Sequence, residues 1–156
     1  MAETIRSVLF VCLGNICRSP SAEAVFRHKA DQQRLFIEID SAGTQGYHTG
    51  SPPDERSVAA GQSRGYSFEG ITCRKVTKQD FEYFDLIIAM DEVNLRHLQS
   101  ESPDDYHHKI HMFMSFSSFE EETVPDPYYG GKKGFEYVLD LIEDASDGLI
   151  KHITSK

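Results

Sequence analysis

The 156-residue chain contains no tryptophan and only three cysteines, and it has no apolar run long enough to cross a membrane. The longest apolar stretch near the N-terminus, residues 8–13, is too short for a signal-peptide core or a membrane span, and a Gly-Asn pair follows it instead of a small-residue cleavage site. We therefore expect a cytoplasmic protein. Because Cys12, Cys17 and Cys73 form no CxxC pair, a disulfide framework and a four-cysteine zinc site are both excluded, and free thiols are expected.

Positive charge is also scarce, with 16 Lys and Arg against 25 Asp and Glu and a net charge of -9. Such a charge repels nucleic acid and anionic lipid at long range, so we expect neither nucleic-acid binding nor membrane insertion. A bound anion must then be held by a local positive field. A chain of this length buries about two thirds of its unfolded surface without a disulfide or a metal, which predicts one domain over residues 1–156 and no cofactor.

Strand-like and helix-like segments alternate along the chain. β-branched and aromatic residues concentrate in residues 7–11, 36–39, 85–90 and 110–113, with helical patterns between them. This alternation is typical of an α/β domain with a parallel sheet. Because residues 8–11 and 86–90 are apolar throughout, we predict that these two strands are central and are covered by helices on both faces.

Four helices are predicted between and after the strands. The first begins at Ser19 and Pro20, since a serine suits the N-cap and a proline the first turn, and it runs to about residue 34. The second begins near residue 53 and the third follows Asp91. From Gly134 onward, apolar residues recur at spacings of three and four, which predicts a long amphipathic helix.

Residues 42–53 and 116–133 are predicted to be loops because they are rich in Gly, Ser, Thr and Pro or in acidic residues. Long loops in a compact domain are often functional. In an open parallel sheet, ligands bind at the carboxyl ends of the strands, and Cys12 ends the first strand.

Residues 8–20 run from this apolar strand into a cysteine, a short loop, an arginine and a helix start. At such a position the helix N-terminus stabilises a thiolate on Cys12 and attracts a phosphate dianion. Gly14 would let the loop curl by taking backbone angles that other residues avoid, and Arg18 would close the ring with a bidentate fork. The alternative is that Cys12 is a small buried hydrophobic residue.

If this loop binds a phosphate monoester, the Cys12 thiolate attacks phosphorus in line and forms a phosphocysteine, while Arg18 and the loop amides stabilise the equatorial oxygens. The Ser19 hydroxyl either donates to the Cys12 sulfur or simply caps the helix. Tyr128 and Tyr129 either wall a slot for an aryl phosphate or lie on the surface of a turn.

The leaving group needs a proton from a carboxylic acid on the same face of the sheet. Asp126 lies between two prolines that hold its backbone extended, but the pattern does not choose among the loop candidates Asp54, Asp104, Asp105 and Asp126. The histidines at 107, 108 and 111 lead into an apparent strand without the glutamate of a zinc hydrolase, so we predict solvated residues and no metal site.

Several segments together resemble the low-molecular-weight protein tyrosine phosphatases in order and spacing, over nearly the whole chain. They are VCLGNICRSP at 11–20 with AEA at 22–24, DSAGT at 40–44, MDE at 90–92 with NL at 94–95, and DPYYG at 126–130. The resemblance implies a four-stranded parallel sheet with helices on both faces. It also implies hydrolysis of phosphotyrosine in proteins, and of aryl phosphates, through a phosphocysteine intermediate.

The same resemblance assigns roles to individual residues. Cys12 is implied to be the nucleophile, Arg18 the phosphoryl-binding residue, and Asp126 the acid that later activates water. Asn15 and Ser41 brace the loop, and Tyr47 lies in a loop that sets substrate preference. The remaining residues implied to contact the substrate are Leu13, Gly14, Asn15, Ile16, Cys17, Ser19, Tyr128 and Tyr129.

In the family Cys17 can also form a reversible disulfide with Cys12 under oxidants, although a packed loop cysteine fits the sequence equally. One departure is that many relatives carry a histidine that helps hold the loop asparagine, where this chain has Ile71 or Thr72.

Two other functions remain as alternatives. Thioredoxin-coupled arsenate reductases share the implied fold but need two further cysteines, and Cys73 is the only one left in this chain. A phosphotyrosine-binding module without turnover would lack the acid or the thiol, and both are present.

Overall fold

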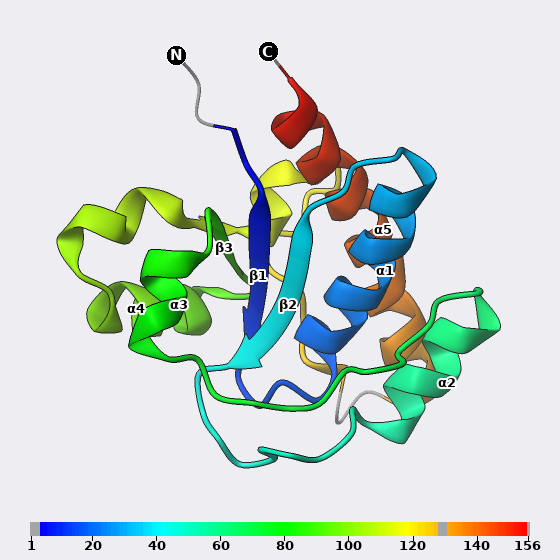
Figure 1. Cartoon of the computed structure of the whole chain (residues 1–156). Helices are drawn as coiled ribbons and strands as arrows, with labels where there is room; N and C mark the ends of the chain where they lie inside the picture. The colour runs from blue at the N-terminus through cyan, green and yellow to red at the C-terminus, as the bar shows by residue number, and fades with distance from the viewer. Residues whose placement is uncertain (1–3, 128–130, 156) are drawn as a thin grey trace.

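In the computed structural model, which describes residues 4–127 and 131–155, four parallel strands form one sheet (Figure 1). The strands lie in the order β2-β1-β3-β4. Their bounds are Ser7–Cys12 (β1), Glu38–Gly43 (β2), Leu86–Ala89 (β3) and Ile110–Met112 (β4). The predicted α/β fold with a parallel sheet is confirmed. Two predicted site residues, the tyrosines at 128 and 129, lie outside the described residues.

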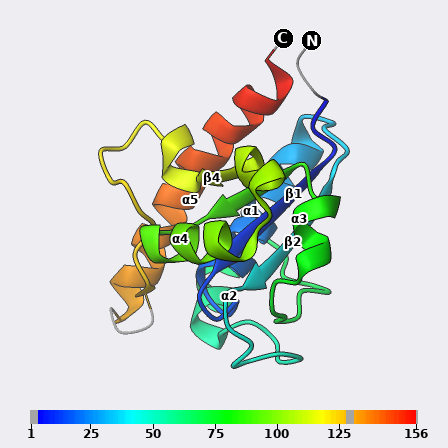
Figure 2. The ribbon, with the colours of Figure 1, turned by 90° about the vertical axis from the view of Figure 1, so that its left-hand side faces the viewer.

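Helices cover both faces of the sheet, as predicted. The α-helices in the described residues are α1 (Arg18–Gln32), α2 (Glu55–Ser63), α3 (Lys78–Tyr83), α4 (Glu92–Glu101) and α5 (Gly131–Thr154), and two 3-10 turns are η1 (Asp104–Lys109) and η2 (Phe113–Phe116). Figure 1 shows α1, α2 and α5 on one side of β1 and α3 and α4 on the other. Figure 2 shows α4 crossing in front of the strands.

The side chains of β1 explain why both faces are covered. All six residues of this strand are buried. Val8 and Phe10 pack into the cluster formed with α1 and α5, whereas Leu9 and Val11 pack with apolar residues of α3 and α4. Alternate side chains of a strand point to opposite faces, so an apolar strand needs a helical layer on each side.

The sequence misplaced one strand and two helix starts, since α5 begins at Gly131, inside the predicted loop, and not at Gly134. β2 begins two residues later than predicted and continues to Gly43, because the backbones of 40–43 pair with β1 while Phe36 is 79% exposed. The first helix begins at Arg18 with Cys17 as its N-cap residue, so Ser19 is not the cap. The helix α3 and the two 3-10 turns were not predicted.

The C-terminal helix agrees with its predicted pattern. Its apolar residues at spacings of three and four, from Phe135 to Leu149, are buried against the sheet. No helix in the described part of the chain is long and apolar enough to span a membrane.

Candidate active site

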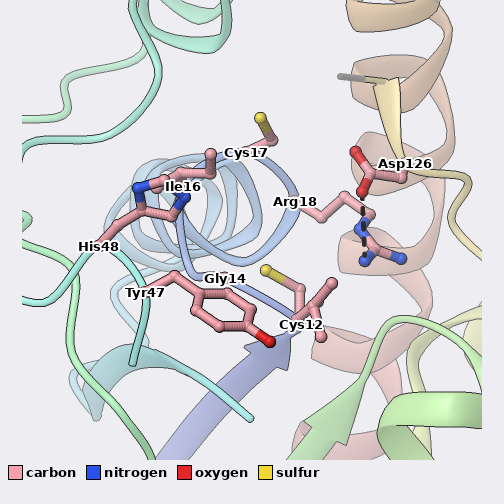
Figure 3. A pocket seen from close by; sticks show the side chains of 9 residues that line it. Cys12, Gly14, Ile16, Cys17, Arg18, Tyr47, His48 and Asp126 are labelled. Atoms are coloured by element: carbon pink, nitrogen blue, oxygen red, sulfur yellow. Dashed lines mark ion pairs between the residues drawn. The ribbon is translucent and has the colours of Figure 1, made fainter. Parts of the chain in front are cut away.

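The carboxyl ends of the strands hold a pocket of about 330 Å³ (Figure 3). It opens where β1 passes through a short loop into α1, the position expected for an anion site in an open parallel sheet. The residues that line it are Cys12, Leu13, Gly14, Ile16, Cys17, Arg18, Tyr47, His48 and Asp126. The structure therefore brings together the predicted nucleophile, arginine and acid from segments more than a hundred residues apart.

The loop is shaped by Asn15, which has a left-handed backbone with φ of 59°. Its N–H donates to the Cys12 sulfur at 3.3 Å, and its side-chain Oδ1 accepts from the backbone N–H of Arg74 at 2.9 Å. The Cys73 thiol donates to the carbonyl of Asn15 at 2.8 Å. These contacts hold a strained conformation that an asparagine tolerates better than most residues, and they aim an amide at the sulfur.

Gly14 does not have the unusual backbone that the sequence suggested. Its φ is not positive, so that expectation is wrong, and the left-handed residue of the loop is its neighbour Asn15. A Cβ at Gly14 would lie 3.3 Å from the His48 ring. The histidine packs closely on the glycine, so a larger residue at this position would push the ring outward by a few tenths of an ångström.

Ser19 contacts the Cys12 sulfur instead of capping the helix. Its Oγ lies 3.0 Å from Sγ and accepts from Asn15 Nδ2 at 2.8 Å. The same amide nitrogen donates to Ser41 Oγ at 3.0 Å, which is the predicted contact between the loop asparagine and β2. The Asn15 N–H donates to the sulfur and the Ser19 hydroxyl lies within hydrogen-bond distance of it, so two polar groups face the sulfur.

Arg18 is only 4% exposed and is fixed from behind. Its Nη1 donates to Asp91 Oδ2 at 2.6 Å and to the carbonyl of Val124 at 3.1 Å. Burial alone would lower the pKa of Arg18, but the charges of Cys12 and Asp91 outweigh it and raise that pKa above its usual value. The guanidinium therefore stays charged and presents a fixed face to the pocket.

Asp126 is the acid candidate that lies at this pocket. Its Oδ2 is 4.0 Å from Arg18 Nη2, and its side chain is 45% exposed at the rim. The carboxylate of Asp54 instead caps α2 by accepting from Arg56 N–H at 2.8 Å. Asp104 and Asp105 lie on η1. This turn directly precedes β4, so it lies at the amino ends of the strands, away from the pocket.

Tyr47 and His48 form the outer wall of the pocket. Tyr47 is 73% exposed, and Figure 3 shows its ring beside the Cys12 side chain. The sequence predicted Tyr47 but not His48. Nothing in the residue pattern marked the histidine, because its place follows from its packing on Gly14 across a gap of more than thirty residues.

Cys17 is buried beside Ser57 of α2. Burial raises the pKa of Cys17 to about 12, although a hydrogen bond with Ser57 acts in the opposite direction. In Figure 3 the sulfurs of Cys12 and Cys17 do not point toward one another. As the structure stands, Cys17 is a protonated thiol facing α2.

Asp91 is a functional residue that the sequence reasoning left without a role. It caps α4 by accepting from Asn94 N–H at 2.8 Å, while its second oxygen holds Arg18. The sequence did contain a signal for Asp91, because the residue comes two positions after the buried strand β3, whose carboxyl end must lie beside that of β1.

The histidines at 107, 108 and 111 lie on η1 and β4, away from the pocket. His107 Nε2 is 3.1 Å from the carbonyl of Ser102. Within residues 4–127 and 131–155, no group of three or more metal-binding side chains is positioned to hold a metal ion.

Comparison with known proteins gives a consistent result. The family model described as "Low molecular weight phosphotyrosine protein phosphatase" matches residues 7–156. A putative low molecular weight protein-tyrosine-phosphatase of Synechocystis sp. is 48% identical over 147 residues, covering 92% of this chain and 93% of that protein. A low molecular weight phosphotyrosine protein phosphatase of Homo sapiens is 44% identical over 143 residues, covering 88% and 90%. A crystal structure of a protein tyrosine phosphatase from Entamoeba histolytica with Hepes in its active site superposes with a TM-score of 0.90 at 46% identity, covering 93% and 94%.

Proposed function

This chain belongs to the low molecular weight phosphotyrosine protein phosphatase family and is a hydrolase of phosphoric monoesters, and from that premise we propose that Cys12 is its nucleophile toward phosphotyrosine. The observation that carries the assignment is the position of the Cys12 sulfur, which contacts Asn15 N–H at 3.3 Å and Ser19 Oγ at 3.0 Å at the floor of the pocket. No other described cysteine combines such contacts with a place beside Arg18.

In the first step, the Cys12 thiolate attacks phosphorus and the tyrosine oxygen leaves. Arg18 and the backbone amides of residues 13–18 bind the equatorial oxygens, which carry more charge in the transition state than in the substrate. Arg18 suits this role because Asp91 and Val124 already hold one of its nitrogens. The phosphoryl group then remains on sulfur as a phosphocysteine.

Asp126 gives its proton to the leaving phenoxide and then takes a proton from the water that attacks the phosphocysteine. Its place at the pocket rim, 4.0 Å from Arg18 Nη2, supports this role over that of the other three acids. Ser19 donates to the sulfur as it leaves in the second step. Tyr47 contacts the aromatic ring of the substrate. The resemblance implies the same role for the tyrosines at 128 and 129, which lie outside the described residues.

The simplest test compares the wild-type protein with Cys12→Ser on an aryl phosphate. We expect the wild type to hydrolyse it and Cys12→Ser to bind phosphotyrosine without turnover, because a serine hydroxyl remains protonated where a thiolate forms. An inactive wild type that reduces arsenate, or one that binds phosphotyrosine without hydrolysing it, would exclude the phosphatase assignment.

A second test addresses the acid. Asp126→Asn removes the proton donor, so it should slow aryl phosphates with poor leaving groups by about 100-fold or more and activated ones much less. Asp105→Asn is the matched control, because η1 lies at the amino ends of the strands, away from the pocket. Equal slowing of both substrate classes would assign the proton to another residue.

Cys17 is proposed to protect the nucleophile from oxidation. Peroxide would oxidise the Cys12 thiolate to a sulfenic acid, and the Cys17 thiol would displace water from it to form a disulfide. The Cys17 sulfur faces α2, so the loop has to rearrange first. Peroxide inactivation should be reversed by a thiol reductant in the wild type and not in Cys17→Ser; irreversible loss in the wild type would contradict this role.

We also infer that the catalytic domain spans residues 1–156 and works in the cytoplasm on phosphotyrosine-containing proteins. The mechanism requires a reduced Cys12, and all three cysteines are free thiols in the structure. A reducing compartment maintains that state. Fractionation of cells expressing the chain, followed by alkylation of its thiols, tests the location.

A further inference from the structure

A hollow of about 510 Å³ lies between the first turns of α4 and the segment that follows η2. Its apolar lining consists of Leu95, Met112, Met114 and Phe119, and we call the hollow lined by these four residues the side groove. Met114 is buried, whereas Phe119 is 46% exposed. Methionine side chains are flexible and suit surfaces that adapt to different apolar groups.

The charged residues that line the side groove are mostly acidic. They are Glu92 on the first turn of α4, the three glutamates at 120–122, and a single arginine, Arg96. All four glutamates are exposed, and no basic side chain in the described part of the chain forms an ion pair with any of them. An apolar hollow with such a rim complements a ligand that carries positive charge beside an apolar side chain.

Both walls of the side groove begin at residues that hold Arg18 in the catalytic pocket. On α4, Glu92 directly follows Asp91, which accepts from Arg18 at 2.6 Å. On the other wall, Glu122 lies two residues before Val124, whose carbonyl accepts from Arg18 at 3.1 Å. Consecutive Cα atoms are about 3.8 Å apart, so the Cα atoms of Glu122 and Val124 are at most about 8 Å apart. In Figure 2 the segment between η2 and α5 passes one end of α4, and the side groove adjoins the catalytic pocket there.

The flanks of a bound phosphotyrosine reach this distance. An extended peptide advances about 3.3 Å per residue, so the residues two to four places from the phosphotyrosine lie about 7 to 13 Å from it. A peptide whose phosphate is held by Arg18 can therefore lay these residues in the side groove.

We propose that the side groove binds the stretch of a protein substrate that flanks the phosphotyrosine, and that it selects lysine or arginine beside an apolar residue. The inference rests on the proposed phosphatase function and names the class of substrate. The apolar side chain packs on Phe119 and the methionines, and the cation lies at the carboxylates of Glu120 and Glu122. The two charges of such a substrate match the positive pocket and the acidic groove.

Two phosphotyrosine peptides test the charge preference. One carries lysines and leucines at the positions two to four places on each side of the phosphotyrosine, and in the other each lysine is replaced by glutamate. At about 0.1 M salt we expect the wild-type kcat/KM to be at least about 10-fold higher for the lysine peptide. The difference should lie mainly in KM, because the groove contacts no reacting atom. Equal values, or a preference for the glutamate peptide, would overturn the proposal.

The double variant Glu120→Gln/Glu122→Gln removes two charges from the groove. It leaves in place Glu121, which accepts a hydrogen bond from Tyr137 of α5. The preference for the lysine peptide should fall about fivefold, since each exposed ion pair contributes modestly. Because the preference is a ratio of two kcat/KM values, a change in the catalytic pocket common to both peptides cancels. A preference equal to that of the wild type would overturn the proposal.

The matched control is the double variant Glu82→Gln/Asp105→Asn. Both residues are exposed and lie at the amino ends of the strands, at the end of α3 and on η1. It removes the same amount of charge at a distance that salt screens, so the wild-type preference should remain. An equal fall in both double variants would mean that the preference follows the net charge of the protein, and the proposal would fail.

Phe119→Ala tests the apolar part of the groove. In the wild type, replacing the leucines of the lysine peptide by serine should lower kcat/KM about threefold or more, and in Phe119→Ala that loss should largely disappear. An undiminished loss in Phe119→Ala would contradict the proposed packing. Sedimentation tests another occupant: a wild-type dimer that dissociates in Glu120→Gln/Glu122→Gln would assign the groove to a second copy of the chain and overturn the proposal.

Peptide binding to Cys12→Ser separates this inference from the proposed function. Fluorescence anisotropy of the two labelled peptides needs no turnover, and the lysine peptide should bind more tightly by a factor similar to the kinetic preference. If the wild type hydrolyses neither peptide, the proposed function fails, and the ratio of the two affinities still decides whether the side groove selects basic flanks. Equal affinities would overturn the proposal.

Discussion

A single left-handed residue, Asn15, sets the chemistry of the loop at the residue scale. Its backbone turns one N–H toward the Cys12 sulfur, and its side chain spans Ser19, Ser41 and Arg74. The Cys73 thiol donates to its carbonyl at 2.8 Å. The asparagine is thus held on every side, and the loop is organised before a phosphate arrives.

Arg18→Lys is predicted to lose most of the activity. In the structure one guanidinium nitrogen is committed to Asp91 and Val124, and the remainder of the fork faces the pocket. An ammonium is a point charge that cannot serve Asp91 and two phosphate oxygens together. We expect kcat/KM for an aryl phosphate to fall by about 100-fold or more.

Arg34→Lys is the control for replacing an arginine by a lysine. Arg34 is exposed just after α1, so this variant should be fully active. Steady-state kinetics at several substrate concentrations separate kcat from KM. Retention of more than a tenth of wild-type kcat/KM in Arg18→Lys would show that the planar fork is not needed.

The residue pattern found the part of the site that lies in one short segment, the family resemblance added Ser41, Tyr47 and Asp126, and His48 and Asp91 were missed. Cys12 and Arg18 stand in one short segment whose pattern predicts an anion-binding loop. The residue pattern alone did not choose among four acids, whereas the family resemblance singled out Asp126, which the fold places at the pocket. His48 packs on Gly14 and Asp91 holds Arg18 only after the chain has folded, so their roles depend on tertiary contacts that no local pattern records.

At the scale of elements, two glycines of α5 test how closely this helix packs. A Cβ at Gly148 would lie 1.7 Å from the carbonyl oxygen of Phe116 in η2, so the helix could not approach that turn. At Gly134 the nearest atoms, of Pro127, are 3.7 Å away, which is ordinary contact.

Gly148→Ala should therefore destabilise the protein by about 3 kcal/mol or more, whereas Gly134→Ala should be neutral or stabilising by up to about 1 kcal/mol. Denaturant unfolding of both variants beside the wild type gives the comparison. Equal stabilities of the two variants would mean that η2 moves aside without cost.

His111 of β4 is predicted to make stability depend on pH. Burial lowers the pKa of His111 below its usual 6.5. The nearby charges of His152 and His108 add to this effect, and a hydrogen bond to the backbone of His108 opposes it. The unfolded chain binds the proton more readily, so the stability is fully present above pH 6.5 and falls as the pH drops toward the folded value. Asp85 lines the same hollow and His111 stacks edgewise on Phe116.

Replacing His111 by phenylalanine should reduce the loss of stability between pH 7 and pH 5, by at most about 1.4 kcal/mol per pH unit for one proton. The measurement is the denaturation midpoint at each pH, with His97→Phe on α4 as the control for an added ring. An unchanged pH dependence in His111→Phe would assign the effect to other groups.

Element prediction succeeded where burial and periodicity agreed. The apolar strands β1 and β3 and the long amphipathic helix α5 have patterns that only one structure satisfies. β2 was displaced because its paired residues are DSAG, a sequence typical of a turn, and their strand conformation comes from hydrogen bonding to β1. α3 has six residues, too few to show a helical period, and it is stabilised by a capping box between Thr77 and Asp80.

At the scale of the whole molecule, a positively charged anion-binding site lies on a protein whose net charge is negative. The chain carries a net charge of -9, yet Arg18 and the start of α1 form a local field for an anion at the carboxyl edge. The site joins β1 and α1 to α4, through Asp91, and to the segment carrying Asp126. An anion bound there is held by elements from across the chain, none of which holds it in the unfolded state.

Inorganic phosphate is therefore predicted to stabilise the entire fold. A ligand that binds only the native state adds about 2.7 kcal/mol at a hundred times its Kd, which for a domain of this size raises Tm by about 5 to 10 °C. Cys12→Ser should respond at least as strongly, since it removes the repulsion between thiolate and dianion, whereas Arg18→Lys should respond weakly. Added salt also screens the repulsion among the acidic residues, so each melting curve needs a chloride control at equal ionic strength. A rise in Tm that chloride reproduces, or one that is equal in Arg18→Lys, would mean that phosphate acts on the surface charge and not at the loop.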